Sequence, residues 1–353
     1  MSRRLDWNSD GLNWPNRASS RFVRAGGLNW HVQVMGKGPV LLLLHGTGAS
    51  THSWRDLAPL LAKRFTVVAP DLPGHGFTGE ASPLQLSLPG MASALGTLLT
   101  ELKLKPEIGV GHSAGAAVLL RMAIDKTILP KAVVSLNGAI QPFAGLAGQI
   151  FAPIARVLAL WPAVPSLFAW RASDPGVIGD LLRRTGSRID PEGALQYGLL
   201  ARNPAHVGAA LGMMANWDLP SLNRELGKVP CPVLLIAGAL DEMVPSSDAR
   251  ITQGMVPDAR VVRLKGLGHL AHEEQPVLVA GLIDDVFHGR ELKLDPAKGR
   301  EAGRSTGNDI GRAATRGRLP PAAVAGERHA NGHKGVGRTG SPLVGTAATR
   351  KTT

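Results

Sequence analysis

The chain has 353 residues, 44% of them hydrophobic, and a formal net charge of +12 at pH 7, so it can bury a sizeable core and is not a wholly disordered polymer. The charge is uneven, because residues 296–353 hold eleven Lys and Arg against three Asp and Glu and so carry +8. The basic balance therefore belongs mainly to this C-terminal segment and does not indicate a nucleic-acid-binding fold.

Cysteine usage and hydropathy indicate the compartment. Cys231 is the single cysteine, so no internal disulfide can form and the chain fits a reducing environment. The positive charges near Met1 are not followed by an apolar stretch, and no run of eighteen uncharged apolar residues occurs. We therefore expect a cytoplasmic protein with neither a signal peptide nor a membrane-spanning helix.

Strands and helices alternate in the first part of the chain. Residues 1–20 are polar and are expected to lie across the domain surface, and a β-hairpin is predicted over residues 22–35. The apolar run at 40–44 is typical of a parallel strand that is covered on both faces. Further strands are predicted at 65–69, 107–110 and 132–136, and helices at 54–62, 91–102 and 114–124. This alternation predicts a mostly parallel central sheet with helices on both faces.

Residues 138–217 interrupt the alternation, because they are apolar and proline-rich and contain no convincing strand. Strands then return at 233–237 and 260–264, and helices at 246–255 and 277–287. We interpret the chain as an α/β fold with a helical lid inserted after the sixth strand, over the sheet edge where such folds bind ligands. The predicted segments are a surface segment at 1–20, the core at 21–137 and 218–293, the lid at 138–217, and a basic tail at 294–353.

The basic tail has the composition of a disordered segment. Residues 296–353 contain no Phe, Trp or Tyr and are rich in Gly, Ala, Arg and Thr. Such a segment buries too little apolar surface to offset the entropy that is lost on ordering. We expect a solvated tail or an unselected extension, and a basic arm for an anionic membrane or nucleic acid is the less favoured alternative.

Residues 111–115 match the pattern G-x-S-x-G, with Ser113 at the centre, between a predicted strand and a predicted helix. A serine hydroxyl is a poor nucleophile until a base takes its proton, and a tight strand-to-helix turn presents the hydroxyl where a base can reach it. The turn also places Ser113 at a helix N-terminus, where the N–H of Ala114 can face a developing oxyanion. We predict that Ser113 is the nucleophile and that Ala114 provides one oxyanion donor.

Two residues that follow later strands complete a predicted catalytic triad. Asp241 and His269 each come just after a predicted strand, so both reach the sheet edge that carries Ser113. The order Ser, Asp, His is the one expected in this architecture. His269 would act as general base, and Asp241 would fix the imidazole tautomer and stabilise the imidazolium. Glu242 is the rival acid, but its neighbour better fits the position after the turn.

The loop after the strand at 40–44 supplies the second predicted oxyanion donor, the backbone N–H of Thr47. The lid supplies a predicted apolar substrate pocket, with the alternative that most of its side chains pack onto the core. The residues assigned to this pocket are Phe143, Phe151, Leu158, Trp161 and Trp170. No paired His or Cys spacing indicates a metal site, and neither G-x-G-x-x-G nor a P-loop is present, so we expect no metal and no cofactor.

Residues from about 20 to 290 resemble the α/β-hydrolase superfamily, through the motifs at 45–48, 71–76, 111–115, 238–245 and 268–276. Together these motifs imply the α/β-hydrolase fold. A closer resemblance is to the magnesium-chelatase accessory proteins of bacteriochlorophyll biosynthesis, and it is carried by residues 30–33, 45–57 and 71–78. That family implies a photosynthetic bacterium and a role around the insertion of magnesium into protoporphyrin IX. It gives a pathway rather than a reaction.

These observations leave several functions open. The first is a cofactor-independent serine hydrolase that acts on an ester or similar acyl compound, and the second is a non-catalytic accessory protein that binds a tetrapyrrole or magnesium chelatase. A haloperoxidase-type enzyme would use the same triad, whereas epoxide hydrolases and dehalogenases are disfavoured because they carry Asp in place of Ser113. We expect a small apolar or tetrapyrrole-related substrate and no nucleic-acid partner. Peripheral contact with the photosynthetic membrane, through the lid or the tail, stays open.

Overall fold

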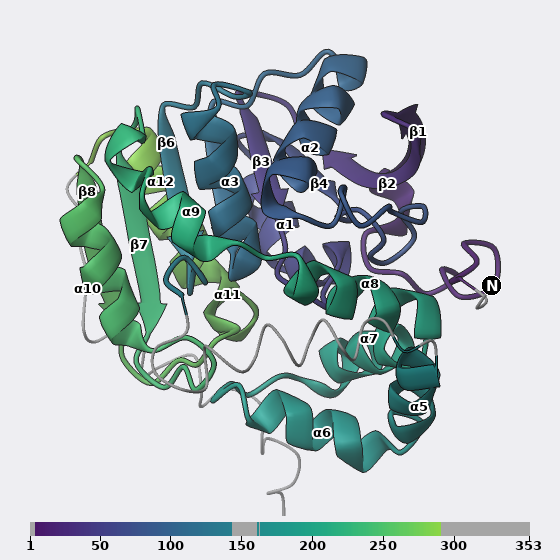
Figure 1. Cartoon of the computed structure of the whole chain (residues 1–353). Helices are drawn as coiled ribbons and strands as arrows, with labels where there is room; N and C mark the ends of the chain where they lie inside the picture. The colour runs from purple at the N-terminus through teal and green to yellow at the C-terminus, as the bar shows by residue number, and fades with distance from the viewer. Residues whose placement is uncertain (1–3, 143–160, 162, 291–353) are drawn as a thin grey trace, which may run out of the picture. The chain divides into compact units, whose positions relative to one another are not determined.

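A computed structural model describes residues 4–142, 161 and 163–290. Eight strands form one sheet in the order β1-β2-β4-β3-β5-β6-β7-β8 (Figure 1). Strand β2 pairs antiparallel with β1 and β4, and the remaining pairs are parallel, so the predicted mostly parallel sheet is confirmed. The strands are β1 Ser20–Ala25, β2 Leu28–Met35, β3 Val40–Leu44, β4 Thr66–Pro70, β5 Ile108–His112, β6 Ala132–Leu136, β7 Val233–Gly238 and β8 Ala259–Leu264.

Helices cover both faces of this sheet. On one face α1 and α12 contact each other, and on the other face α2 packs against α3. Successive residues of β3 point to opposite faces: Leu41 and Leu43 join the core under α1 and α12, and Leu42 and Leu44 join the core under α2 and α3. The helices outside the lid are α1 Leu57–Leu61, α2 Leu88–Leu102, α3 Ala114–Ile124, α9 Leu219–Asn223, α10 Ser246–Met255, α11 Ala271–Glu274 and α12 Pro276–Phe287. Short 3-10 helices lie at η1 Arg17–Ser19, η2 Thr51–Trp54 and η3 Leu226–Lys228.

Two helices differ from their predicted bounds by more than one residue, for local reasons. Helix α2 starts earlier than residue 91, because the Ser87 hydroxyl accepts the N–H of Gly90 at 3.2 Å and caps the helix. The helix predicted over 54–62 is divided into η2 and the short α1. Pro59 has no N–H to donate, so it is tolerated only in the first turn of a helix, and α1 begins two residues before it.

The lid lies between β6 and β7, as predicted, at the carboxyl ends of the parallel strands (Figure 1). Its described helices are α5 Ala163–Arg171, α6 Pro175–Arg183, α7 Pro191–Ala201 and α8 Pro204–Ala215. The last three each begin with a capping side chain followed by proline, a strong start signal: the caps are Asp174, Asp190 and Asn203. The predicted pocket residues Phe143, Phe151 and Leu158, and the tail from residue 294, lie outside the described residues.

Candidate active site

Ser113 occupies the turn between β5 and α3 in a conformation that few non-glycine residues adopt, with φ 51° and ψ −119°. Its small neighbours make this turn sterically possible. A Cβ on Gly111 would lie 2.5 Å from the N of Ala116, and a Cβ on Gly115 would lie 2.1 Å from the carbonyl O of Leu44. Such strain persists only where the surroundings enforce it, and it presents the Ser113 side chain at the sheet edge.

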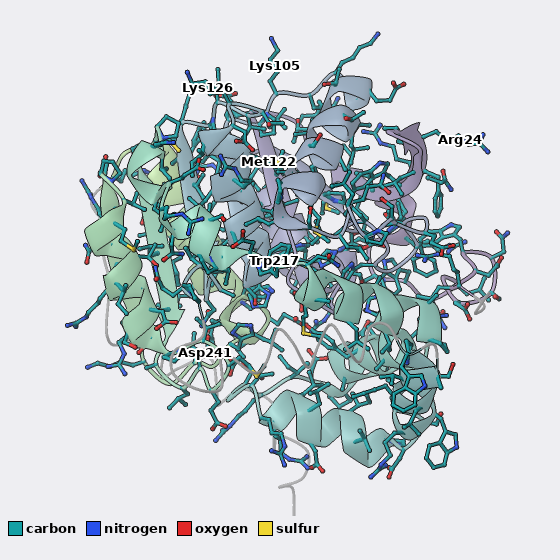
Figure 2. All side chains as sticks on the ribbon, viewed as in Figure 1. Arg24, Lys105, Met122, Lys126, Trp217 and Asp241 are labelled. Atoms are coloured by element: carbon teal, nitrogen blue, oxygen red, sulfur yellow. The ribbon has the colours of Figure 1, made fainter. Side chains whose placement is uncertain are left out.

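Asp241 and His269 meet at the same edge. The Nδ1 of His269 lies 2.8 Å from Oδ2 of Asp241, and both side chains are almost completely buried. Figure 2 shows Asp241 beyond the end of β7 on the side of the lid, whereas Lys105 and Lys126 lie at the opposite end of the sheet. The structure thus brings together the two side chains that were predicted to be acid and base, one after β7 and one after β8. Glu242, the rival acid, is exposed.

The Asp241 carboxylate is held by a complete set of donors. Its Oδ1 accepts the backbone N–H groups of Met243 and Val244, each at 2.8 Å. Its Oδ2 accepts the amide of Asn137 at 2.7 Å in addition to the His269 ring. Sequence reasoning missed Asn137, although its place at the end of β6 beside β7 was a usable signal. Asn137 has φ 48°, which Asn tolerates better than most residues.

Ser113 and His269 do not form a hydrogen bond with each other among the described residues. Catalytic hydrogen bonds often shorten to working distance only when substrate binds. Asp241 and His269 are therefore hydrogen-bonded to each other in this structure, whereas Ser113 and His269 are not.

The loop with the predicted second oxyanion donor lies directly against Ser113. A Cβ on Gly46 would come within 2.9 Å of the Ser113 Cβ, so only glycine permits this approach. Within the described residues, no carbonyl or side chain accepts the N–H of Thr47 or of Ala114. Both N–H groups are thus available for an oxyanion near Ser113.

Two buried histidines fix the shape of this loop. His45 donates from Nδ1 to the Gly46 carbonyl at 2.8 Å and accepts the Leu72 N–H at Nε2, at 2.9 Å. From lid helix α8, His206 donates to the Gly48 carbonyl at 3.0 Å. Burial lowers the pKa of His45 below its ordinary value, so the ring is neutral and keeps this donor–acceptor pattern.

Two further histidines lie behind His269. His112 donates from Nε2 to the His269 carbonyl at 2.9 Å, and its ring lies 4.5 Å from that of His272. Burial, with the two neighbouring imidazoles, holds the pKa of His112 well below its ordinary value, and burial lowers the pKa of His272 to about 3. Both rings are neutral near pH 7, so neither opposes the positive charge that a general base at His269 must take up.

A buried ion-pair network attaches the lid to the core. Arg55, after η2, pairs with Glu273 of α11, and it also reaches Asp190, the cap of α7, at 2.8 Å. Tyr197 of α7 and Ser53 each donate to the Glu273 carboxylate at 2.6 Å. Although burial lowers the pKa of Arg55, Glu273 and Asp190 raise it above its ordinary value, so the guanidinium stays charged. Removing one partner of such a pair would strand a buried charge, so the network holds α7 in place.

A second lid segment contacts the His269 loop itself. The N–H of His269 donates to the Thr185 carbonyl at 3.0 Å, and the N–H of Leu270 donates to the Ser187 hydroxyl at 2.8 Å. Glu274 completes the loop by accepting the Gly268 N–H at 2.8 Å. The lid therefore helps to position His269, which the sequence did not indicate.

Two of the predicted pocket residues, Trp161 and Trp170, lie among the described residues of the lid. Trp161 is 65% exposed and Trp170, on α5, is 71% exposed. Both side chains are thus open to contact with a ligand or another surface, and the described residues do not close a pocket around them. Their assignment to the substrate pocket therefore stays a prediction.

The described part of the chain contains neither a candidate metal-binding cluster nor a candidate membrane-spanning helix. It contains no cluster of three or more His, Cys, Asp or Glu side chains that could hold a metal ion. None of its helices combines the length and the apolar character needed to span a membrane.

Comparison with known proteins decides the family. The model of the alpha/beta hydrolase family matches residues 41–282, which is more than half of the chain. The chain belongs to the alpha/beta hydrolase family. A crystal structure of an alpha/beta hydrolase fold protein from Burkholderia ambifaria aligns with a TM-score of 0.65 and 21% identity, and covers 81% of this chain and 100% of that one. At this identity the structural likeness shows the fold alone.

Two sequence relatives of this alpha/beta hydrolase are informative. The magnesium-chelatase 30 kDa subunit of Rhodobacter capsulatus is 40% identical over 279 residues, covering 78% of this chain and 97% of the relative. The pimeloyl-acyl-carrier protein methyl ester esterase of Aromatoleum aromaticum is 33% identical over 264 residues, covering 71% of this chain and 99% of the relative. The resemblance to magnesium-chelatase proteins that the sequence motifs carried is thus confirmed.

Proposed function

We propose that this protein is a serine hydrolase that cleaves an ester or similar acyl compound at Ser113. His269 serves as general base and Asp241 orients it. The observation that supports this most directly is the 2.8 Å bond between His269 Nδ1 and Asp241 Oδ2 at the edge where the strained turn presents Ser113. The likeness to a methyl ester esterase supports the ester class.

The proposed reaction follows from the positions of these groups. The Ser113 Oγ attacks the carbonyl carbon while His269 Nε2 takes the hydroxyl proton, and Asp241 stabilises the imidazolium that results. The N–H groups of Thr47 and Ala114 stabilise the oxyanion of the tetrahedral intermediate. His269 then protonates the leaving alkoxide, and water hydrolyses the acyl–Ser113 ester by the same steps in reverse order.

The nucleophile assignment is tested by labelling and by turnover. Purified protein should be labelled at Ser113 by a fluorophosphonate, and turnover of short p-nitrophenyl esters should fall by roughly 10⁴-fold in Ser113→Ala. The matched control is Ser93→Ala, which changes an exposed serine of α2 and should leave turnover unchanged. A wild-type protein that is not labelled at Ser113, or an unaffected Ser113→Ala enzyme, would refute the assignment.

We further propose that this chemistry serves bacteriochlorophyll synthesis, around the insertion of magnesium into protoporphyrin IX. The supporting observation is the 40% identity to a relative named as a magnesium-chelatase subunit. A non-catalytic role is the competing candidate, in which the protein binds a tetrapyrrole or the chelatase and uses the hydrolase fold only as a scaffold. The two roles differ in whether the Ser113 hydroxyl is needed.

Genetic complementation separates the two roles. In a photosynthetic host that lacks its own copy, wild-type protein should restore bacteriochlorophyll, and Ser113→Ala should leave the early intermediates that the deletion strain accumulates. Serine-to-alanine removes one oxygen and hardly changes the shape of the site, so a binding protein would tolerate it. Full restoration by Ser113→Ala, at equal protein level, would establish the scaffold role and reject catalysis as the pathway function.

A further inference from the structure

A second serine–histidine–aspartate arrangement lies away from the candidate active site, and consists of Ser20, His31 and Asp71. The Nδ1 of His31 lies 2.8 Å from Oδ2 of Asp71, and its Nε2 lies 2.9 Å from the Ser20 Oγ. A nucleophile within hydrogen-bond reach of a base that a third group orients is the diagnostic pattern of an activated nucleophile. Here all three groups are already in contact.

Strand pairing builds this arrangement. Ser20 starts β1, the edge strand of the sheet, and lies opposite Gln33 of β2. His31 lies two residues before Gln33, so the two side chains share one face of the sheet. Asp71 follows β4, and its N–H donates to the His31 carbonyl at 2.9 Å. Backbone hydrogen bonds therefore fix the position of Asp71 relative to His31.

Asp71 is held as a carboxylate. It is fully buried, its Oδ1 accepts the Thr51 N–H at 2.7 Å, and its Oδ2 accepts the Phe77 N–H at 2.9 Å. Burial alone would raise the pKa of Asp71, but the imidazoles of His31 and His45 and the Phe77 N–H hold it below its ordinary value. An ionised Asp71 keeps the proton of His31 on Nδ1 and leaves the Nε2 lone pair for a hydroxyl proton.

The Ser20 hydroxyl has two side-chain partners, His31 and Gln33. The Gln33 side chain donates from Nε2 to the Pro15 carbonyl at 2.6 Å and to the Ser20 Oγ at 3.2 Å. With the His31 proton on Nδ1 facing Asp71, Nε2 is the acceptor, so the Ser20 hydroxyl donates its proton to His31. The rings of Trp7 and other aromatic residues enclose His31, which is fully buried, whereas Ser20 is half-buried at the open sheet edge. His31 is therefore a base in apolar surroundings, and the hydroxyl of Ser20 beside it is only half-buried.

We propose that Ser20 is a second reactive serine, which takes an acyl group from small activated esters and a phosphonyl group from small fluorophosphonates. With p-nitrophenyl acetate, Oγ attacks the carbonyl carbon and its proton passes to His31 Nε2. The bond to the phenolate oxygen breaks with its electron pair, and the phenolate takes the proton from His31. The products are acetyl–Ser20 and p-nitrophenol. This inference is independent of the function proposed for Ser113.

The test uses the full chain with Ser113→Ala, so that any acylation of the first site is removed. The protein is incubated with p-nitrophenyl acetate, and acetylation at each serine is followed by tandem mass spectrometry over time. Ser19 is an internal reference, because it neighbours Ser20 in the chain and has no imidazole partner among the described residues. We expect Ser20 to react about 100-fold faster than Ser19, the lower end of general-base assistance.

Two further histidine variants show whether the rate depends on His31. Adding His31→Gln should reduce the Ser20 rate to that of Ser19. His288→Gln is the matched control, because His288 contacts Asp284 but no serine in the part of the chain that the structure describes, and it should change nothing. Unfolding the parent in urea should also equalise the two serines, which keeps the test valid if His31→Gln fails to fold. Equal rates in the folded parent, or an unchanged Ser20 rate in folded His31→Gln, would overturn the proposal and leave a structural hydrogen-bond network.

Discussion

Replacing Asp241 by Asn tests how the candidate active site sets the protonation of His269. The two backbone N–H groups at Oδ1 require an acceptor there, so the Asn side chain must put its NH₂ in the place of Oδ2. That NH₂ then faces two donors, the Asn137 amide at 2.7 Å and the His269 Nδ1–H at 2.8 Å. The conflict at His269 is relieved only if the ring moves its proton to Nε2.

The magnitude follows from this change of tautomer. A proton on Nε2 prevents His269 from accepting the Ser113 proton, and the same substitution in a serine protease triad reduces kcat about 10⁴-fold. At about 1.36 kcal/mol per tenfold change in rate, this corresponds to about 5 kcal/mol of transition-state stabilisation. The remaining donor–donor contact with Asn137 should lower the free energy of unfolding by about 1–3 kcal/mol.

The assay is steady-state turnover of a p-nitrophenyl ester, with chemical denaturation to measure stability. The matched control is Glu242→Gln, which makes the same carboxylate-to-amide change on the neighbouring exposed residue and should alter kcat less than about twofold. An Asp241→Asn enzyme that keeps wild-type kcat, or a Glu242→Gln enzyme that loses it, would show that the orienting acid has been misassigned.

Three further results are expected. Asn137→Gly keeps the positive φ without strain but removes the amide that donates to Asp241. The kcat should therefore fall about tenfold with little change in KM. An unchanged kcat would show that Asn137 does not position Asp241. Gly46→Ala places a Cβ 2.9 Å from the Ser113 Cβ, so the loop or Ser113 must be displaced. This displacement should reduce kcat about 100-fold at a nearly unchanged Tm. Full activity would mean that the loop can move freely. Because the pKa of Asp71 is lowered by folding, its stabilisation is present above its unfolded-state pKa of about 3.9 and is lost as the pH falls below it. The fall in unfolding free energy between about pH 4 and pH 2 should be shallower in Asp71→Asn, and equal slopes would contradict this.

The local pattern of apolar and polar residues was sufficient to predict much of the fold. The apolar run of β3 predicted a strand covered on both faces, and the structure buries alternate leucines under opposite helix layers. Helix boundaries were less certain, because they depend on single side chains such as the Ser87 cap and Pro59. The place of Ser113 followed from residues 111–115 alone, because a strand-to-helix turn of this kind needs small residues at fixed offsets.

The sequence by itself determined the order of strands and helices and the chain positions of Ser113, Asp241 and His269, since each is tied to the end of a local element. Only the tertiary structure decided which distant groups meet: Asn137 with Asp241, the lid carbonyl of Thr185 with His269, and Ser20 with His31. It also shows that Trp161 and Trp170 lie exposed, which hydropathy alone did not indicate. The physical reason is that hydropathy and spacing act over a few residues, whereas these contacts depend on sheet register and on the packing of the lid, which bring together residues far apart in the chain.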